Sequence, residues 1–307
     1  GFAGSEQLRA DRDPSVFTTI LSGAIGDPDS ILDNTLHVVQ AEDVGPTGVL
    51  SGFTIQRGVA NQDGTQGDGG GIRIVGGAPV IDDVVVRQCQ AARFGSAILV
   101  QDASPLLNRV QVNRNGWASE PSGTVVVDGG APVILNMQIN GNRNGDFAAL
   151  QMRQLTGALL ANLTVWGNET DGATAGIDIR PGSEAEVVSS IVWGNVPANP
   201  APGQSLDKDN ANGLDTRSRY TTVEGWPEFG DGNDGRDPSF VDADGPDGNP
   251  GTADDDLRLA AGSPLIDAGD NTGLPPFVNL DLAGMARFVD DPSTPDSGVG
   301  QIGRAHV

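Results

Sequence analysis

The sequence has very little positive charge. Its 307 residues include 18 Lys and Arg against 41 Asp and Glu, a formal net charge of −23, and Lys208 is the single lysine. Affinity for nucleic acid comes from Lys and Arg side chains that displace counterions from phosphates. Attraction to anionic lipid depends on the same side chains. The composition therefore argues against nucleic acid and against an anionic membrane surface as partners.

Cysteine, histidine and long apolar runs are also scarce. Cys89 is the single cysteine, so an internal disulfide is excluded, and His37 and His306 are the two histidines. Two histidines so far apart in the sequence do not form a zinc-ligand spacing. They also leave few candidates for the histidine of a Ser-His-Asp triad. No stretch approaches the roughly 20 apolar residues that a membrane-spanning helix needs. The many Asp, Asn and Gly residues favour an exported protein in a saline or calcium-containing medium.

Glycine and proline are plentiful, with 44 and 20 residues, and they punctuate an internal repeat. Pro79, Pro105 and Pro132 lie in matching phrases at nearly equal intervals, and the pattern continues at Gly157 and Glu184. Seven positions before these five anchors stand apolar residues: Ile72, Ile98, Val125, Leu150 and Ile177. A repeat this short cannot bury its apolar face alone, but it can when it stacks on the next copy.

Each repeat also contains an alternating strand and a polar turn. Apolar residues alternate with residues of mixed character, and a period of two predicts a strand with one face buried and one exposed. The residues assigned to the exposed face are Arg73, Leu99, Val126, Gln151 and Asp178. After the last strand of the repeat comes a recurring asparagine, which predicts a stacked ladder, with Cys89 as a buried member one repeat earlier. The ladder asparagines are Asn115, Asn142, Asn168 and Asn195.

These regularities predict an all-β fold, a right-handed single-stranded parallel β-helix (solenoid) with a loop-rich C-terminal segment. We divide the chain into N-terminal coils with a cap over 1–58, regular coils over 59–200 and a loop-rich region over 201–307. Because Leu257, Leu259 and Pro264 repeat the offsets of the earlier coils, this last region is expected to contain a final coil. Loops over 58–71 and 197–219 are expected to project from the coils.

Several phrases carry a family resemblance. They are GFAGSE at 1–6, TILSG at 19–23, GFTI at 52–55, DPSFVD at 237–242, DLRL at 256–259 and GSPLIDAG at 262–269. Together they resemble bacterial exported right-handed β-helix proteins, especially those called choice-of-anchor Q proteins. The resemblance implies the β-helix fold and an extracellular address.

An acidic segment late in the chain alternates carboxylates with glycines. Calcium takes six to eight oxygens from carboxylates, amides and carbonyls, and glycine lets a loop wrap around the ion. The order is similar to the start of an EF-hand loop, but it has an extra residue before Asp247 and no closing Glu. We predict a calcium site here, with a solvated acidic loop as the alternative. The candidate ligands are Asp242, Asp244, Asp247, Asn249, Asp254, Asp255 and Asp256. A weaker candidate set is Asp231, Asn233, Asp234 and Asp237.

The exposed face of the first strand also holds candidate catalytic residues. A polysaccharide lyase needs a base to remove a proton beside a carboxylate, and cations to stabilise the charge that develops. Arg153, Asp178 and Arg180 fall on adjacent coils and are the residues that such a lyase would use. The alternative is a set of cross-coil salt bridges. Asp128 and Asp178 are the carboxylates that an inverting glycosidase would use, at the wide separation it requires.

The sequence favours an exported structural or interaction module without catalysis, a rigid surface scaffold stabilised by calcium. Its expected partners are other extracellular or surface proteins, as a subunit of a larger assembly, and a glycan. The other hypothesis is a polysaccharide lyase or carbohydrate-binding β-helix protein acting on an anionic glycan, although a charge of −23 repels a polyanion. Trp166 and Trp193, one repeat apart, are expected on neighbouring coils as packing residues or as a sugar platform.

Overall fold

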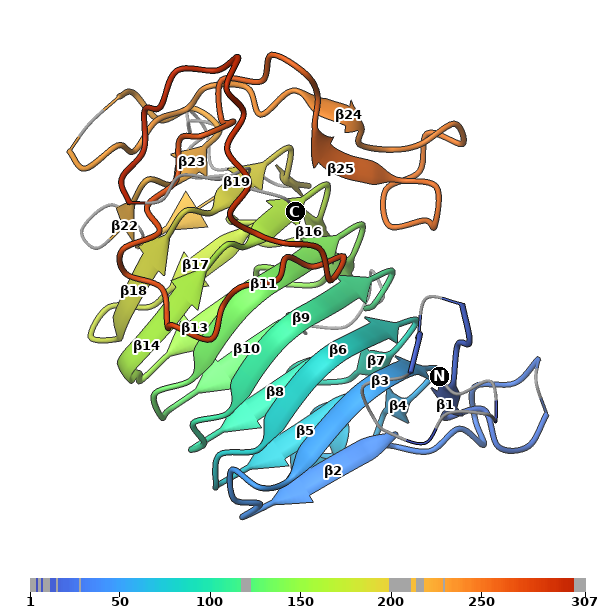
Figure 1. Cartoon of the computed structure of the whole chain (residues 1–307). Coiled ribbons are helices and arrows are strands. Elements are labelled where there is room, and N and C mark those ends of the chain that lie inside the picture. The colour runs from blue at the N-terminus through green and yellow to red at the C-terminus, as the bar shows by residue number, and fades with distance from the viewer. Residues whose placement is uncertain are drawn as a thin grey trace.

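The computed structural model describes residues 4, 7, 12–14, 16–27, 29–116, 123–198, 211–213, 218–228 and 230–300. In this part of the chain, strands from successive repeats lie side by side and parallel, in sheets that run the length of the molecule (Figure 1). The parallel β-helix expected from the repeat is therefore confirmed. The described residues contain no helix long and apolar enough to cross a membrane.

Two large sheets form the walls of the solenoid. The first sheet has seven strands in the order β2 (Val39–Glu42), β5 (Ile72–Val75), β8 (Ile98–Gln101), β10 (Val125–Asp128), β13 (Leu150–Arg153), β17 (Ile177–Ile179) and β21 (Ala211–Asn212). The second sheet has eleven strands: β1 (Ile20–Ser22), β3 (Val49–Gln56), β6 (Val80–Arg87), β9 (Leu106–Asn113), β11 (Val133–Asn140), β14 (Thr156–Ala161), β15 (Thr164–Trp166), β18 (Glu184–Val188), β19 (Ile191–Trp193), β22 (Ser218–Arg219) and β23 (Thr222–Val223).

Short strands complete the coils on the remaining side. β12 (Arg143–Asn144), β16 (Glu169–Thr170) and β20 (Val196–Pro197) form a three-stranded sheet, and β4 (Val59–Ala60) pairs with β7 (Gln90–Ala91). The loop expected over 58–71 contains β4 and the short 3-10 helix η2 (Gly64–Gly67). The loop expected over 197–219 falls largely outside the described residues.

The interior is a column of like residues, as the repeat predicts. Ile72 pairs with Ile98, Ile98 with Val125, Val125 with Leu150, and Leu150 with Ile177 across the first sheet. All five side chains are fully buried in the main apolar core. Stacking these residues at one strand spacing removes the apolar face of each coil from water.

The long strands of the second sheet bend at a residue in the left-handed region. Gly52, Asp83, Arg109 and Asn136 hold this position in β3, β6, β9 and β11, with φ between 49° and 77°. Glycine and asparagine tolerate this conformation better than most residues. From β14 onwards the bend separates two strands, so each coil turns between two outer faces of the second sheet.

The predicted asparagine ladder is confirmed at the turn that follows the second sheet. Asn142 donates from its side-chain amide to the Asn168 side chain at 2.9 Å and to the Val112 carbonyl at 2.9 Å. It accepts from the backbone and side-chain N–H groups of Asn115. Cys89 starts the ladder, because its backbone N–H donates to Asn115 Oδ1 at 2.9 Å.

The expectation of an exposed outer face on the first sheet is wrong for most of its length. Leu99, Val126 and Gln151 are at most 2 % exposed, and Arg73 and Asp178 are also buried. Described residues just before the strands contact this face: a Cβ on Gly123 would lie 3.1 Å from the Val126 side chain, and Phe94 lies under Arg153. Phe94 and Phe147 also lie together, with ring centroids 5.7 Å apart. A period of two identifies the two faces of a strand, but it does not show what covers the second one.

The expected final coil is also corrected. The strand that contains Leu257 and Leu259, β25 (Asp256–Leu259), pairs antiparallel with β24 (Phe240–Asp242) as a separate hairpin. The chain beyond it lies along the outer face of the second sheet (Figure 1). There Val278 packs with Leu135, Ala161 and Val188 in a small apolar cluster. The same offsets therefore produce a hairpin, because this strand finds its partner locally rather than in a preceding coil.

Candidate functional site

A groove of about 840 Å³ lies on the second sheet. Its floor is one column of outward-facing residues on β3, β6, β9 and β11, namely Thr54, Val85, Gln111 and Gln138, which are register partners. One wall is the segment 251–258 of the β24–β25 hairpin, and Leu282 and Ala283 of the C-terminal segment also line the groove.

Strand alternation places these side chains on the floor. In β9, the flanking residues Val110 and Val112 are fully buried in the core, so Gln111 between them faces outward. The parallel register repeats the arrangement from coil to coil, at the strand spacing of about 4.8 Å. The groove therefore presents amide and hydroxyl groups in a row parallel to the solenoid axis.

The hairpin wall is fixed to the end of β11. Asn140 donates to Asp255 Oδ2 at 2.8 Å, and the same oxygen accepts from the Gly251 backbone at 2.6 Å. Gly141, which follows β11 with φ 60°, has no room for a side chain, since a Cβ there would lie 2.2 Å from the Pro250 carbonyl oxygen. This close approach seats the hairpin directly on the turn of the coil.

Charges of both signs line the groove. Arg87, Arg114 and Arg258 supply the positive charge, and Asp254, Asp255 and Asp256 the negative charge. Arg258 pairs with Asp256 at 2.5 Å, and Arg87 donates to the side chain of Gln56 at 3.1 Å. The groove therefore has no marked excess of either sign.

The three carboxyl groups differ in their pKa. Burial raises the pKa of Asp255, against the hydrogen bonds that it accepts. The hydroxyl of Thr252 donates to Asp254 and is the main reason that the pKa of Asp254 is lowered. Hydrogen bonds from Arg258 lower the pKa of Asp256.

The residues predicted to bind calcium lie on the hairpin and its loop, and several of them already have protein partners. Asp242 faces Asp256 across the hairpin, and Asp247 accepts from the Asn249 backbone at 2.8 Å. Within the described residues, no three of the six aspartates, Asp242, Asp244, Asp247, Asp254, Asp255 and Asp256, have carboxylate oxygens within 4.8 Å of one another. Calcium binding by this loop stays a prediction.

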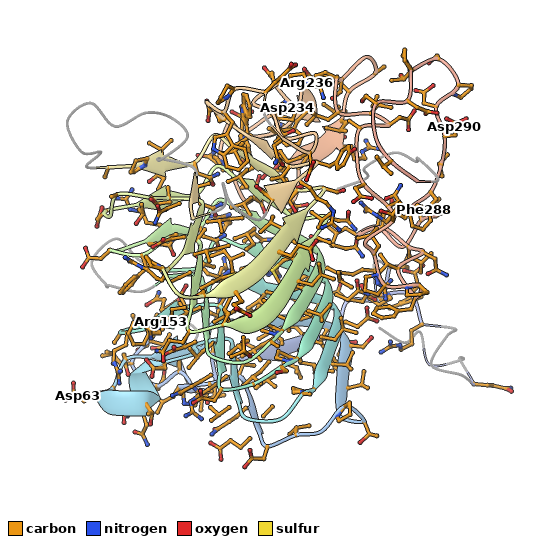
Figure 2. All side chains as sticks on the ribbon, turned by 90° about the vertical axis from the view of Figure 1, so that its left-hand side faces the viewer. Asp63, Arg153, Asp234, Arg236, Phe288 and Asp290 are labelled. Carbon is orange, nitrogen blue, oxygen red and sulfur yellow. The ribbon has the colours of Figure 1, made fainter. Side chains whose placement is uncertain are left out.

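Two residues of the weaker candidate set, Asn233 and Asp234, are engaged in hydrogen bonds within the last coil. Asn233 accepts from the Thr221 backbone at 3.1 Å. Asp234 accepts from the Thr222 hydroxyl at 2.8 Å and pairs with Arg236 at 2.5 Å (Figure 2). These bonds accompany a parallel backbone bridge between Thr222 and Asp234.

The candidate lyase residues are divided between two ion pairs. Arg153 pairs with Asp128 at 3.0 Å and lies over the Phe94 ring, 4.4 Å from its centroid. Arg180 pairs with Asp178 at 2.9 Å. Asp178 also accepts from Gln151 at 3.1 Å and from Asn212 at 2.8 Å. The Arg153–Asp128 pair is a cross-coil salt bridge, the alternative considered for this cluster.

The candidate catalytic residues predicted from the sequence were drawn from the first sheet, whereas the groove lies on the second sheet. Gln111 and Gln138 are polar residues between apolar ones in the sequence. This pattern indicates an outward-facing strand position, but it does not distinguish a binding groove from any other exposed strand. A groove also needs walls, and those come from residues much later in the chain. Trp166 and Trp193 are register partners on neighbouring coils, as expected, but they do not line the groove.

Comparisons of the chain with protein-family models, curated proteins and solved structures found no match. The fold assignment therefore rests on the strand register of this structure. Any functional assignment rests on its groove and its side-chain clusters.

Proposed function

We propose that the protein is an exported, non-catalytic scaffold that holds an extended neutral polysaccharide in the groove of its second sheet. The observation that carries this proposal is the row of Thr54, Gln111 and Gln138 along the groove floor. Each glutamine amide both donates and accepts hydrogen bonds, as sugar hydroxyls do. Polar groups on three of the four neighbouring coils of the groove floor suit a ligand that is itself a repeating polymer.

A stiff groove reduces the cost of binding such a chain. The floor residues lie on strands paired on both sides, so little backbone entropy is lost when a ligand orders the site. The apolar floor residue Val85 offers contact to the faces of sugar rings. The same rigidity suits a surface scaffold or a subunit of an extracellular assembly.

Charge favours a neutral polysaccharide over an anionic one. The whole chain carries −23, which repels polyanions over the range of the Debye length. The groove has three arginines, but three aspartates stand beside them. An anionic glycan is therefore the less favoured ligand and serves as one arm of the test.

A lyase at Arg153, Asp178 and Arg180 is the less favoured function. A lyase base must reach a substrate proton, whereas Arg153 is engaged by Asp128 and Phe94, and Arg180 by Asp178. Export, an extracellular, cell-surface or periplasmic location, and membership of the choice-of-anchor Q group are proposed from the sequence phrases. Calcium binding by the acidic loop is part of the same proposal.

The test is affinity electrophoresis of the full chain in gels that contain neutral polysaccharides, such as xylan or glucomannan, or anionic ones, such as alginate or pectate. We expect retardation by a neutral polysaccharide. Because each lost hydrogen bond removes about 1 kcal/mol, Gln111→Ala/Gln138→Ala should weaken binding about tenfold or more. Gln101→Ala, at the end of β8 and outside the groove, is the matched control.

Three results would contradict the proposal. The first is equal retardation of the double variant and the Gln101→Ala control. The second is no retardation in any gel. The third is release of unsaturated products from alginate, pectate or chondroitin, measured by ultraviolet absorbance with and without calcium. Loss of that release in Arg153→Ala or Arg180→Ala would establish the lyase instead.

A further inference from the structure

Three aspartates from two segments of the C-terminal region meet at one point. Carboxylate oxygens of Asp267, Asp290 and Asp296 all lie within 4.8 Å of one another. Asp267 is fully buried, whereas Asp290 and Asp296 are exposed. Calcium binds oxygens at 2.3–2.6 Å, so ligands on opposite sides of one ion are about 5 Å apart. The three oxygens are therefore close enough to share one cation.

The backbone holds this arrangement in place. The Asp291 N–H donates to Asp267 Oδ2 at 3.2 Å, and the N–H groups of Ser297 and Gly298 both donate to the Asp267 carbonyl oxygen at 3.0 Å. The segment 290–298 thus starts and ends at Asp267 and carries the other two aspartates near its ends. Figure 2 shows Asp290 on this outer part of the C-terminal segment.

The second carboxylate oxygen of Asp267 has no partner. Oδ1 is buried and makes no hydrogen bond, which is unfavourable for any polar atom and more so for a charged one. Among the described residues, none of the ion pairs includes Asp267, Asp290 or Asp296. A positive charge at this point would satisfy the orphan oxygen and offset the repulsion among the three carboxylates.

We propose that Asp267, Asp290 and Asp296 bind a calcium ion. A hard divalent cation suits an all-carboxylate set, and calcium accepts an irregular shell that water can complete, whereas magnesium demands near-ideal octahedral geometry. This site is separate from the acidic loop over 242–256. Its ligands come from two separate segments of the C-terminal region, so no single sequence motif contains the whole site.

The site lies next to the attachment of the C-terminal segment to the coils. Asp270, three residues after Asp267, exchanges hydrogen bonds with the Ser189 hydroxyl at 2.8 and 3.2 Å. It also pairs with Arg219 at 2.6 Å. Calcium would tie the segment 290–298 to this anchor and so stabilise the end of the solenoid.

The experiment is calorimetric titration of the chelator-stripped full chain with Ca²⁺, accompanied by thermal melts. We expect the wild type to bind Ca²⁺ and to melt roughly 5 °C higher at saturation. Asp290→Asn/Asp296→Asn alters only exposed ligands, so the protein should fold. In this variant one Ca²⁺ site should be lost or weakened at least tenfold. Asp247→Asn, in the acidic loop, is the matched control and should keep that site.

The proposal would be overturned if the stripped wild type took up no Ca²⁺, or if Asp290→Asn/Asp296→Asn bound it as the wild type does. Loss of all binding in Asp247→Asn alone would assign the ion to the acidic loop instead. Tighter binding of Mg²⁺ than of Ca²⁺ would also contradict the assigned cation. Since none of these readings involves the groove, polysaccharide binding can fail while the calcium site stands.

Discussion

Asn142 shows how single residues hold successive coils together. Its buried amide bonds to the coils on both sides of its own. It donates to Val112 of the preceding coil and to Asn168 of the following coil, and it accepts from Asn115 of the preceding coil. We expect Asn142→Ala to lower the free energy of unfolding by about 3 kcal/mol, because it leaves buried backbone groups unsatisfied. Denaturant unfolding measures this free energy. The control is Asn113→Ala, on the outer face of the preceding strand, which should change the free energy of unfolding by less than about 1 kcal/mol. Equal losses in the two variants would refute the role of the ladder.

Cys89 begins the ladder and is fully buried. Burial raises the pKa of its thiol from 9.0 to about 12, although hydrogen bonds with the Gly58 and Arg57 backbone lower it. The stability that this group contributes is therefore complete below pH 9 and is lost as the pH rises towards 12, by up to about 1.4 kcal/mol per pH unit.

A comparison of wild type with Cys89→Ala isolates this effect. The difference between their unfolding free energies should shrink between pH 9 and 11, since other titrating groups are shared. An aromatic disulfide reagent should label Cys89 only after unfolding. Rapid labelling of the native protein at pH 8 would mean that the thiol is accessible and not a ladder residue.

At the scale of elements, the C-terminal segment is attached by a buried arginine. Arg287 donates to Asn136 Oδ1 at 3.2 Å, and the amide of Asn136 donates to the Leu280 carbonyl. Burial lowers the pKa of Arg287 to about 10, although Asp281 opposes the shift. The guanidinium therefore joins the segment to the bend of β11.

We expect Arg287→Ala to release this segment while the coils stay folded. Loss of the hydrogen bond from this charged group to Asn136 costs about 2 kcal/mol, and the loss falls on the segment rather than on the strand ladders. Limited proteolysis followed by mass spectrometry should show faster cleavage within 271–300. Arg258→Ala removes an exposed arginine of the hairpin and should leave the cleavage rate unchanged. Cleavage first within 72–190 would contradict the proposed attachment.

The repeat determines the coils but not what lies against them. Ile72, Ile98 and Val125 recur at nearly constant spacing because each must stand above the last, so their column could be predicted from the sequence. The cover over Leu99 and Val126 could not, because apolar outward residues are compatible with either exposure or a second layer. The candidate calcium site in the acidic loop was predicted from residue type alone. The cluster of Asp267, Asp290 and Asp296 could not be predicted, because only the folded chain brings these carboxylates together.

At the scale of the whole molecule, the C-terminal region completes the solenoid. It covers part of the second sheet, forms a wall of the groove and carries the proposed calcium site. Contacts such as that of Asn136 with Leu280 join residues 144 positions apart. Such contacts have no periodic signal in the sequence, which is why the groove emerges only from the structure.

The central claim is that coils stack in the observed register, and chemical cross-linking tests it most directly. Gln111 and Gln138 are one repeat apart, face outward and are register partners. In a Cys89→Ala background, Gln111→Cys/Gln138→Cys should be joined rapidly by a thiol reagent that spans about 5 Å, one strand spacing. Gln101→Cys/Gln138→Cys places its thiols on different sheets and should not react. Failure of the first pair, or equal reaction of both pairs, would contradict the stacked solenoid.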